Sequence, residues 1–340
     1  MGTRLDPPTA DSATADTVFL TGGTGFIGSH VLDALVDSGF RVRALSRREQ
    51  AISPRSGVEV IRGELSRSGD LVPALRGCRY LVHVAALYTF APRQSGRIWT
   101  TNVQGTRSIL EAARIAGCEK AVVTSSSATV GPGKDGRPAT EESWVKAAGR
   151  RGTLRYHVSK VLQERAALAA RIPTVLVLPS APVGPRDWKP TPTGKMILDF
   201  MKGRIFASFA GGLNLVPVED VARGHVLALQ HGADRERYLL GGENFKLAHL
   251  WRVLARICGR RPPAFELPYP IARALAVLDE VRCRLIGDAD PLIPLEGVQM
   301  ARHDMFISSD KAKRELSYVP GPVEDALRRE VSWYHENGYA

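Results

Sequence analysis

Short apolar runs and amphipathic stretches alternate along the first half of the chain. The apolar runs predict β-strands at 18–20, 41–45, 58–61, 80–84, 121–123 and 174–178. Between them, stretches whose apolar residues recur every three or four positions predict helices at 27–36, 98–117 and 158–171. This alternation of strand and helix is typical of an α/β protein with a doubly wound parallel sheet.

A glycine-rich run lies between the first predicted strand and the first predicted helix. It reads Thr21-Gly22-Gly23-Thr24-Gly25-Phe26-Ile27-Gly28. Glycine allows the backbone to turn sharply, and it lets a pyrophosphate approach the first N–H groups of a helix, where the helix dipole favours negative charge. Such a run alone often marks only a turn. Between a strand and a helix it predicts a dinucleotide-binding site.

The pattern of the chain changes after Pro179. Proline is dense over 182–192, and later segments mix short helices with irregular linkers. This change predicts a second, smaller domain. We expect a flexible tail over 1–16, a Rossmann-type dinucleotide-binding domain over 17–180 to which 214–240 returns, and a smaller C-terminal substrate-binding lobe over 181–213 and 241–340.

Composition narrows the class of protein. The chain of 340 residues is 44% hydrophobic and 24% charged, which is ordinary for a globular protein. Its 46 basic and 35 acidic residues give a net charge of +11, but the arginines are dispersed without interleaved aromatic residues, so we expect no nucleic-acid partner. The four cysteines are scattered without metal-ligand spacing, which favours a cytoplasmic protein with no metal site. No apolar run reaches membrane-spanning length.

One apolar stripe in the second half of the chain stands near several arginines. Its members are spaced three or four residues apart, and they are Ile271, Leu275, Leu278, Val281 and Leu285. We expect this stripe to be a buried face of the smaller domain. A contact with a membrane surface is the alternative, because basic residues flank the stripe.

A tyrosine and a lysine stand four residues apart at the start of the last predicted helix. Tyr156 and Lys160 are separated by about one helical turn, so their side chains share a face. They follow a hydroxyl-rich strand end, which reads Thr124-Ser125-Ser126-Ser127. Reduction of a ketone by hydride leaves an alkoxide that must be protonated, and a phenol can donate that proton near neutral pH only beside positive charge. A serine hydroxyl can hold the carbonyl oxygen.

These motifs together resemble the extended short-chain dehydrogenase/reductase family. The resemblance rests on the glycine run, the Tyr156 and Lys160 pair, the serine-rich strand end and the segment 102–106, which reads Asn-Val-Gln-Gly-Thr. The segments 179–187, 214–221, 238–244 and 337–339 are similar to the dihydroflavonol-reductase-like branch, and within it to the group called hopanoid-associated sugar epimerases. The resemblance extends from about residue 17 to the C-terminus.

The resemblance implies a role for each matching residue. Tyr156 would be the acid/base, Lys160 would bind the nicotinamide ribose and lower the pKa of the tyrosine, Ser126 would orient the carbonyl, and Asn102 would brace the site through a water or a backbone bond. Ser125 and Ser127 stay open as alternatives for the serine. The expected cofactor contacts are Gly22, Thr24, Gly25, Phe26, Ile27, Gly28, Arg47, Glu64, Leu65, Ala85, Ala86, Tyr156, Lys160 and Pro179. The expected substrate contacts are Tyr88, Ser127, Ala181 and Trp188. His83 and His157 are expected to pack rather than to act as bases.

The end of the second predicted strand bears on the choice of cofactor. An acidic residue there would bind the ribose 2′-OH of NAD, whereas arginine accommodates a 2′-phosphate. The chain carries Ser46-Arg47-Arg48 at this point. We therefore expect NADP, with NAD as the alternative because paired arginines are also ordinary on a surface.

Departures from the family pattern bear on the reaction. Related dehydratases carry Asp-Glu where this chain has Ser126 and Ser127, and epimerases often carry Asn and Arg where it has Ala181 and Leu213. Without the Asp-Glu pair, water elimination lacks its proton carriers. Without the Asn and Arg, binding of a nucleotide diphosphate is weakened. We expect a dihydroflavonol-reductase-like ketoreductase of a hydrophobic or mid-sized carbonyl or alcohol, acting as a monomer or homodimer. A sugar or sugar-nucleotide epimerase is the first alternative, and a non-catalytic dinucleotide-binding protein is the second.

The segment 189–195 looks like a phosphate-binding P-loop but departs from that pattern at both ends. Lys189 replaces the first glycine, and Met196 replaces the Ser or Thr that would bind magnesium. We expect this loop, with Tyr88 and Trp188, to form either a substrate lid or a plain surface loop.

Overall fold

The computed structural model describes residues 16–48, 52–87, 98–133, 135–145, 155–286, 295–300 and 303–340, without the side chains of residues 155, 156, 284, 296, 297 and 300. Two predictions therefore fall outside it. Tyr88 and nearly all of the predicted tail over 1–16 lie outside the described residues. Tyr156 is described only through its backbone.

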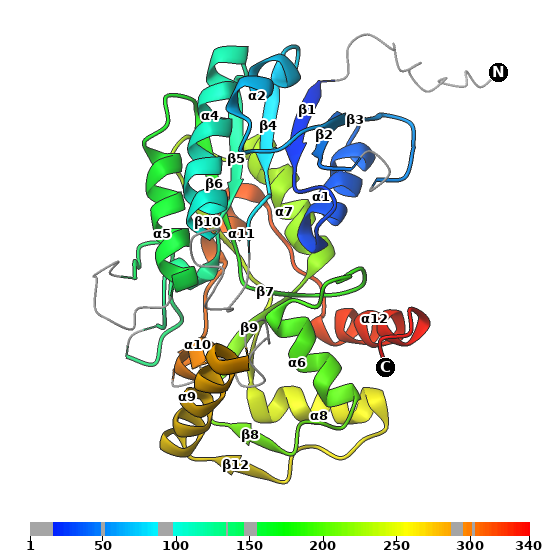
Figure 1. Cartoon of the computed structure of the whole chain (residues 1–340), viewed down its shortest axis with the longest axis vertical. Coiled ribbons are helices and arrows are strands. Elements are labelled where there is room, and N and C mark those ends of the chain that lie inside the picture. The colour runs from blue at the N-terminus through cyan, green and yellow to red at the C-terminus, as the bar shows by residue number, and fades with distance from the viewer. Residues whose placement is uncertain are drawn as a thin grey trace, which may run out of the picture.

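A sheet of seven parallel strands occupies the upper half of the molecule (Figure 1). Its strands are β1 (Thr17–Thr21), β2 (Arg41–Ser46), β3 (Val58–Arg62), β4 (Tyr80–His83), β5 (Lys120–Thr124), β6 (Thr174–Pro179) and β10 (Arg237–Leu240). They are ordered β10-β6-β5-β4-β1-β2-β3, so the chain reverses direction across the sheet between β1 and β4. The six strands expected from the apolar runs are all present, and the doubly wound α/β fold is confirmed.

Helices cover both faces of this sheet. One face packs against α1 (Phe26–Asp37) and α7 (Val218–His231), and the other against α2 (Ser68–Leu75), α4 (Gly105–Ala116) and α5 (Arg155–Leu168). Neighbouring residues of β1 enter opposite cores, because side chains alternate along a strand: Val18 and Leu20 pack with α1, whereas Phe19 packs with α2 and α4. The sheet therefore buries both faces, as continuous apolar strands require.

The lower half of the molecule is built around a smaller sheet. Strand β9 (Gly212–Pro217) pairs with β7 (Ala181–Val183), β11 (Glu243–Lys246) and β13 (Asp304–Met305). Helices α6 (Pro192–Met201), α8 (Leu247–Cys258) and α12 (Val323–Glu336) share one apolar cluster with this sheet. Helix α11 (Asp310–Leu316) instead packs beside α7, where Ala312 and Leu316 join the core of the large sheet.

Helix α9 (Tyr269–Ile286) lies on the outside of this lower half, beside α10 (Leu295–Met300) and near the paired strands β8 (Ala207–Phe209) and β12 (Phe265–Leu267) (Figure 1). Its buried side chains are small, and Ala272 and Ala276 pack against Val298 of α10. Its large apolar side chains are exposed, with Leu278 at 66% and Leu285 at 81%. The expectation that the stripe of residue 271 to residue 285 is buried was therefore wrong, because α9 meets the rest of the described molecule through its alanine face.

No helix within the described ranges has both the length and the apolar character needed to cross a membrane.

Candidate active site

A continuous cavity of about 1770 Å³ runs along the carboxyl ends of the strands of the large sheet and continues between the two halves of the molecule. The cavity includes the point between β1 and β4 where the chain reverses across the sheet, which is where open α/β sheets bind their ligands. Its volume exceeds the ~300–1,000 Å³ of an ordinary small-ligand site, so it has room for a dinucleotide and a second molecule.

The glycine run forms the tight turn that its sequence predicts. Gly22 has φ of +79°, and a β-carbon there would come within 2.6 Å of the backbone nitrogen of Ala85. A β-carbon on Gly28 would lie 1.9 Å from the carbonyl oxygen of Gly22. Gly22 therefore allows the tight turn and its close approach to the backbone after β4. Gly28 allows α1 to pack directly against that turn.

The N-terminus of α1 opens into the cavity without a cap of its own. Gly25 is the N-cap residue, no side chain caps the N–H groups of the first turn, and that turn contains no acidic residue. Phe26 and Ile27 line the cavity, and their N–H groups have no carbonyl partner within the helix. An uncapped helix start beside a glycine turn fits an anionic pyrophosphate, so the residues present suit a dinucleotide.

The ends of β2 and β3 contribute Arg47 and Glu64 to the cavity wall. Ser46 fixes the turn after β2, because its hydroxyl donates to the carbonyl of Arg48 at 2.7 Å and accepts from the same residue's N–H at 3.3 Å. Arg47 is exposed and makes no ion pair with any described carboxylate. Its charge is thus available to an anion in the cavity.

Asn102 lies behind the wall rather than on it, in the five-residue π-helical turn Thr100–Gln104 that precedes α4. Its side-chain oxygen accepts the N–H of Leu87 at 2.7 Å, and its amide donates to the carbonyl of the same residue at 3.1 Å. Leu87 lines the cavity after Ala85 and Ala86. Asn102 therefore holds the backbone that follows β4 through direct backbone bonds.

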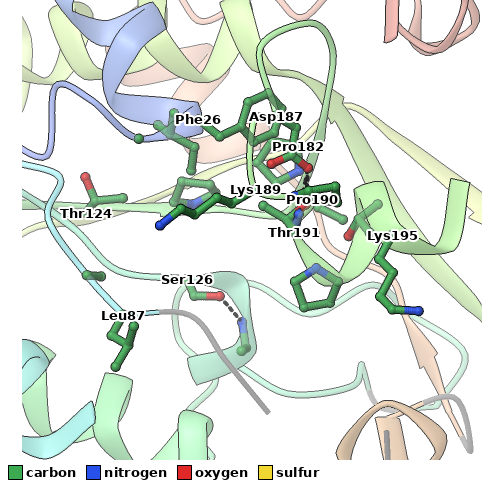
Figure 2. Close-up of a pocket in the computed structure, with 18 of the residues that line it drawn as sticks. Phe26, Leu87, Thr124, Ser126, Pro182, Asp187, Lys189, Pro190, Thr191 and Lys195 are labelled. Carbon is green, nitrogen blue, oxygen red and sulfur yellow. Dashed lines mark hydrogen bonds between the residues drawn. The ribbon is translucent and has the colours of Figure 1, made fainter. Parts of the chain in front are cut away.

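The three serines after β5 have different surroundings. Ser125 is buried and donates its hydroxyl proton to Glu164 at 2.5 Å. Ser126 is half-buried, lines the cavity, and accepts the N–H of Ala128 at 3.2 Å, as the dashed line in Figure 2 shows. Ser127 is half-buried and also lines the cavity. The hydroxyl protons of Ser126 and Ser127 are not donated to a described residue, whereas that of Ser125 is.

Lys160 reaches the cavity from α5 with most of its side chain buried. Its ammonium donates to the carbonyl of Thr124 at 3.0 Å and to the side-chain oxygen of Gln163 at 2.8 Å. Burial lowers the pKa of Lys160 to about 7, and Glu164 opposes this shift. Two of its three N–H donors are therefore held by the protein, and one remains for a ligand.

A chain of buried hydrogen bonds continues from Gln163 to the first strand. Gln163 donates to Thr106 at 3.0 Å, and the imidazole of His83 lies between Thr106 at 2.9 Å and Thr21 at 2.7 Å. Burial, with a smaller effect from Lys160, lowers the pKa of His83 to about 3. His83 thus stays neutral and joins β1 to α4.

A buried ion pair behind Ser125 was missed in the sequence. Glu164 and Arg237 approach to 3.0 Å, and both side chains are almost fully buried. Glu164 also accepts the hydroxyl of Thr129 at 2.6 Å, and Arg237 stacks over the ring of Trp144 at 3.8 Å. The sequence signal was a glutamate one helical turn after Lys160, on a helix face that must be buried.

The opposite end of the cavity is largely apolar. Its wall includes the predicted contacts Ala181 and Trp188 as well as Leu213. The sequence did not predict the other apolar members as site residues, and these are Met196, Ile205, Phe206, Phe209, Leu247, Trp251, Leu267, Leu275, Val298 and Met305. These residues come from segments spread over more than a hundred positions of the chain, so no local sequence pattern predicts that they share a wall.

Three cationic side chains also line this end, and two of them share one carboxylate partner. Asp199 accepts Lys195 at 2.6 Å and faces Arg204 at 3.4 Å. Lys189 makes no ion pair within the described residues. In Figure 2 it extends from its loop toward the space between Phe26 and Ser126.

The C-terminal helix holds the loop that carries Trp188. Glu330 accepts the N–H of Gly184 at 2.9 Å, and the hydroxyl of Tyr334 donates to Asp187 at 3.3 Å. Burial raises the pKa of Asp187 to about 6, while its hydrogen bonds lower it. This loop is thus a fixed part of the cavity wall, and residues 192–201 behind it are helix α6.

The structure brings most of the predicted site residues to one cavity. The lining includes Gly22, Thr24, Gly25, Phe26, Ile27, Gly28, Arg47, Glu64, Leu65, Ala85, Ala86, Ser126, Ser127, Lys160, Pro179, Ala181 and Trp188. Tyr156 lies one helical turn before Lys160 in α5, which places its backbone near the same site. The described residues contain no group of three or more His, Cys, Asp or Glu arranged to hold a metal.

The sequence is similar to proteins named as reductases over nearly its full length. It is 37% identical over 336 residues to a putative dihydroflavonol 4-reductase of Synechocystis sp., which covers 96% of this chain and 97% of the relative. It is 32% identical over 325 residues to 4-hydroxy-2-methyl-3-oxo-4-farnesyl-3,4-dihydroquinoline-1-oxide ketoreductase of Stigmatella aurantiaca, with 92% and 95% covered.

Solved structures show the same architecture. The crystal structure of gox2253 matches with a TM-score of 0.82 and 40% identity, over 95% of this chain and 99% of that one. MoeE5 in complex with UDP-glucuronic acid and NAD matches with a TM-score of 0.72 and 25% identity, over 94% and 99%.

The family model described as the NAD dependent epimerase/dehydratase family matches residues 18–241, which include the glycine turn, the serines after β5 and the Tyr156 and Lys160 pair. The chain therefore belongs to the NAD-dependent epimerase/dehydratase family of extended short-chain dehydrogenases/reductases, and it is an NAD(P)-dependent enzyme.

Proposed function

We propose that this enzyme prefers NADP and transfers hydride between the nicotinamide and a hydrophobic carbonyl or alcohol substrate. The observation that carries the proposal is the composition of this cavity: Ser126 and Lys160 line it together with an extended apolar wall. A substrate seated on that wall would present its carbonyl to the serine.

Each polar residue has a defined task in this proposal. The nicotinamide, when bound, supplies or accepts the hydride. The hydroxyl of Ser126 donates a hydrogen bond to the carbonyl oxygen, since Ser125 already donates to Glu164. The phenol of Tyr156 delivers the proton to the same oxygen. The ammonium of Lys160 stabilises the resulting phenolate and offers its remaining donor to the ribose.

The preference for NADP rests on Arg47. The end of β2 carries no carboxylate that would bind a ribose 2′-OH, and Arg47 faces the cavity without an ion pair among the described residues. Fluorescence titration of NADPH and NADH tests this assignment. Arg47→Ala should weaken NADPH binding by about 1.5–3 kcal/mol and leave NADH binding unchanged. Arg48→Ala is the matched control, because Arg48 does not line the cavity.

The choice of a reductase over an epimerase rests on Ala181 and Leu213. An epimerase must hold a nucleotide diphosphate while the sugar turns, and these positions line the cavity without charge. The names of the Synechocystis and Stigmatella relatives, one a reductase and the other a ketoreductase of a farnesyl-bearing dihydroquinoline oxide, also support a reductase. Purified protein should contain little bound cofactor and should consume NADPH stoichiometrically with an apolar ketone. Tightly retained NAD, with interconversion of two sugar nucleotides and no net change in cofactor absorbance, would overturn the proposal.

One observation favours the epimerase as the second candidate. Lys189 is a cation on the cavity side of the loop, and Asp199 does not neutralise it. It could bind a phosphate of a nucleotide sugar. If the enzyme is an epimerase, UDP should bind in isothermal titration and Lys189→Ala should weaken that binding about tenfold or more.

We also propose that the protein works in the cytoplasm. All four cysteines are free thiols, and Cys78, Cys118 and Cys283 are buried. Burial raises the pKa of Cys118 to about 12, which makes its thiol inert. Thiol titration of the denatured protein without reductant should find four free groups, and fewer would contradict the proposal.

A further inference from the structure

Exposed apolar side chains are concentrated on one part of the lower half of the molecule. Nine of the fourteen large apolar side chains that are exposed in the described chain lie at residue 206, at residue 265 or on α9. Six of them define what we call the apolar platform, namely Phe206, Phe265, Ile271, Leu275, Leu278 and Leu285. Scattered exposed apolar residues need no explanation, but a cluster of this kind marks an interaction surface.

The amphipathicity of α9 is the reverse of that of an ordinary surface helix. Such a helix buries its large apolar side chains and exposes small or polar ones. Here Ala272, Ala276 and Cys283 are buried, while Leu278 and Leu285 face outward. Replacing the outer leucines by polar residues would cost the described fold little, so packing among the described residues does not explain the platform.

The platform continues into the cavity. Phe206 and Leu275 belong to both, and Leu267 of β12 and Val298 of α10 also line the cavity. Phe206 is 69% exposed and its ring lies 6.4 Å from that of Phe265, so this aromatic pair stands at the border between cavity and surface. A molecule leaving the apolar wall would therefore meet the platform first.

The charge of this region matches an anionic surface. Residues 260–286 contain five arginines against three carboxylates, and the whole chain carries +11. Arg260, Arg261 and Arg273 are exposed. Apolar side chains beside arginines on a convex helix are suited to the boundary between headgroups and acyl chains of a bilayer with anionic lipid.

We propose that the apolar platform docks on the surface of a bilayer that contains anionic lipid, and that the substrate moves between that bilayer and the cavity. The docking proposal depends only on the observations about the apolar platform and its charge. The statement about the substrate rests on the proposed function and names its class as an apolar, membrane-dissolved alcohol or ketone.

Vesicle flotation tests the docking without substrate or cofactor. The wild-type chain should float with vesicles of phosphatidylcholine and phosphatidylglycerol, less with phosphatidylcholine alone, and less as salt is raised. The double variant Leu278→Asp and Leu285→Asp should bind about tenfold more weakly or worse, because carboxylates replace the inserted side chains. Ile115→Asp is the matched control, since Ile115 is 56% exposed on α4, outside the platform. It should bind like the wild type.

Other outcomes overturn the docking. Absence of wild-type flotation contradicts it, as does equal loss of binding in the Ile115→Asp control. If light scattering shows a dimer in the wild type and a monomer in the double variant, the platform is a subunit interface instead. Neither Leu278 nor Leu285 lines the cavity, so oxidation of NADPH with a water-soluble ketone should be unchanged in the double variant. If the wild-type enzyme does not oxidise NADPH with any such ketone, the proposed function is contradicted, and the docking proposal is not affected.

Discussion

The two ends of the cavity are constructed in different ways. At the cofactor end, backbone geometry makes the site: Gly22 turns with positive φ, Gly28 admits the turn against α1, and the helix start is left uncapped. At the substrate end, side chains from β7, α6, β9, α8 and α9 meet across the fold. A site made by a short turn can be predicted from adjacent residues, whereas an apolar wall depends on how distant segments pack.

The helices α1 and α9 give a second contrast. Both carry apolar residues at helical spacing, yet α1 buries Val31, Leu32 and Leu35 while α9 exposes Leu278 and Leu285. The pattern alone does not separate them. What differs is the neighbour: α1 packs on the large sheet and α7, whereas the apolar stripe of α9 has no described element over it.

If the chemistry belongs to the cofactor end, Tyr156→Phe should separate binding from turnover. We expect cofactor affinity close to that of the wild type and turnover lowered by about two to four orders of magnitude, because the phenylalanine cannot donate a proton. Stopped-flow measurement of NADPH oxidation with titration of NADPH provides both values. Turnover near the wild-type level would remove Tyr156 from the proposed mechanism.

If the backbone geometry of the glycine turn forms the cofactor end of the cavity, adding one methyl group at Gly28 should destabilise the fold and weaken cofactor binding. Gly28→Ala would place a carbon 1.9 Å from the carbonyl oxygen of Gly22, and the backbone of a tight turn cannot yield easily. We expect a loss of about 1–3 kcal/mol or more in the free energy of unfolding, and weaker NADPH binding.

The matched control is Gly69→Ala in α2, where a β-carbon meets nothing within 4 Å. Urea unfolding should show no loss there and a gain of up to about 1 kcal/mol, because alanine favours a helix. Similar losses in both variants would show that the turn at Gly22 is not the cause.

The buried polar network of the cofactor end should make stability depend on pH. Burial lowers the pKa of Lys160 to about 7, so between pH 7 and 8.5 the unfolded chain binds more protons than the folded one. Stability should therefore rise with pH, by about 1–2 kcal/mol over this window. Lys160→Met should flatten the dependence in urea unfolding of the cofactor-free enzyme. A wild-type profile that is flat or falling contradicts the prediction.

The contrast between α1 and α9 leads to the prediction with the smallest expected effect, a change in the free energy of unfolding at Leu278. Leu278→Ser should change the free energy of unfolding by less than about 0.5 kcal/mol, because the side chain is exposed. Leu32→Ala in α1 should cost about 2–5 kcal/mol, because it leaves a cavity in the core. Thermal or urea unfolding compares them, and a large loss at Leu278 would show that the platform is covered in the folded chain.

Most of the sheet and the cofactor end could be predicted from the sequence because their signals are local. Apolar runs located β1 to β6, and the glycine turn located the start of α1. Asn102 was expected to brace the site, but its partner could not be predicted, since Leu87 is fifteen residues away and is met only through the turn Thr100–Gln104. The pair of Glu164 and Arg237 was missed for the same reason, with its members on α5 and β10.

By itself, then, the sequence determined the alternation of strand and helix, the glycine turn and the spacing of Tyr156 and Lys160, because each depends on residues within one or two turns of each other. The tertiary structure decided which of the three serines donates its hydroxyl hydrogen bond to Glu164, which side chains form the apolar wall, and that the stripe on α9 faces outward. These outcomes depend on which surfaces meet when distant segments pack, and local spacing carries no record of that.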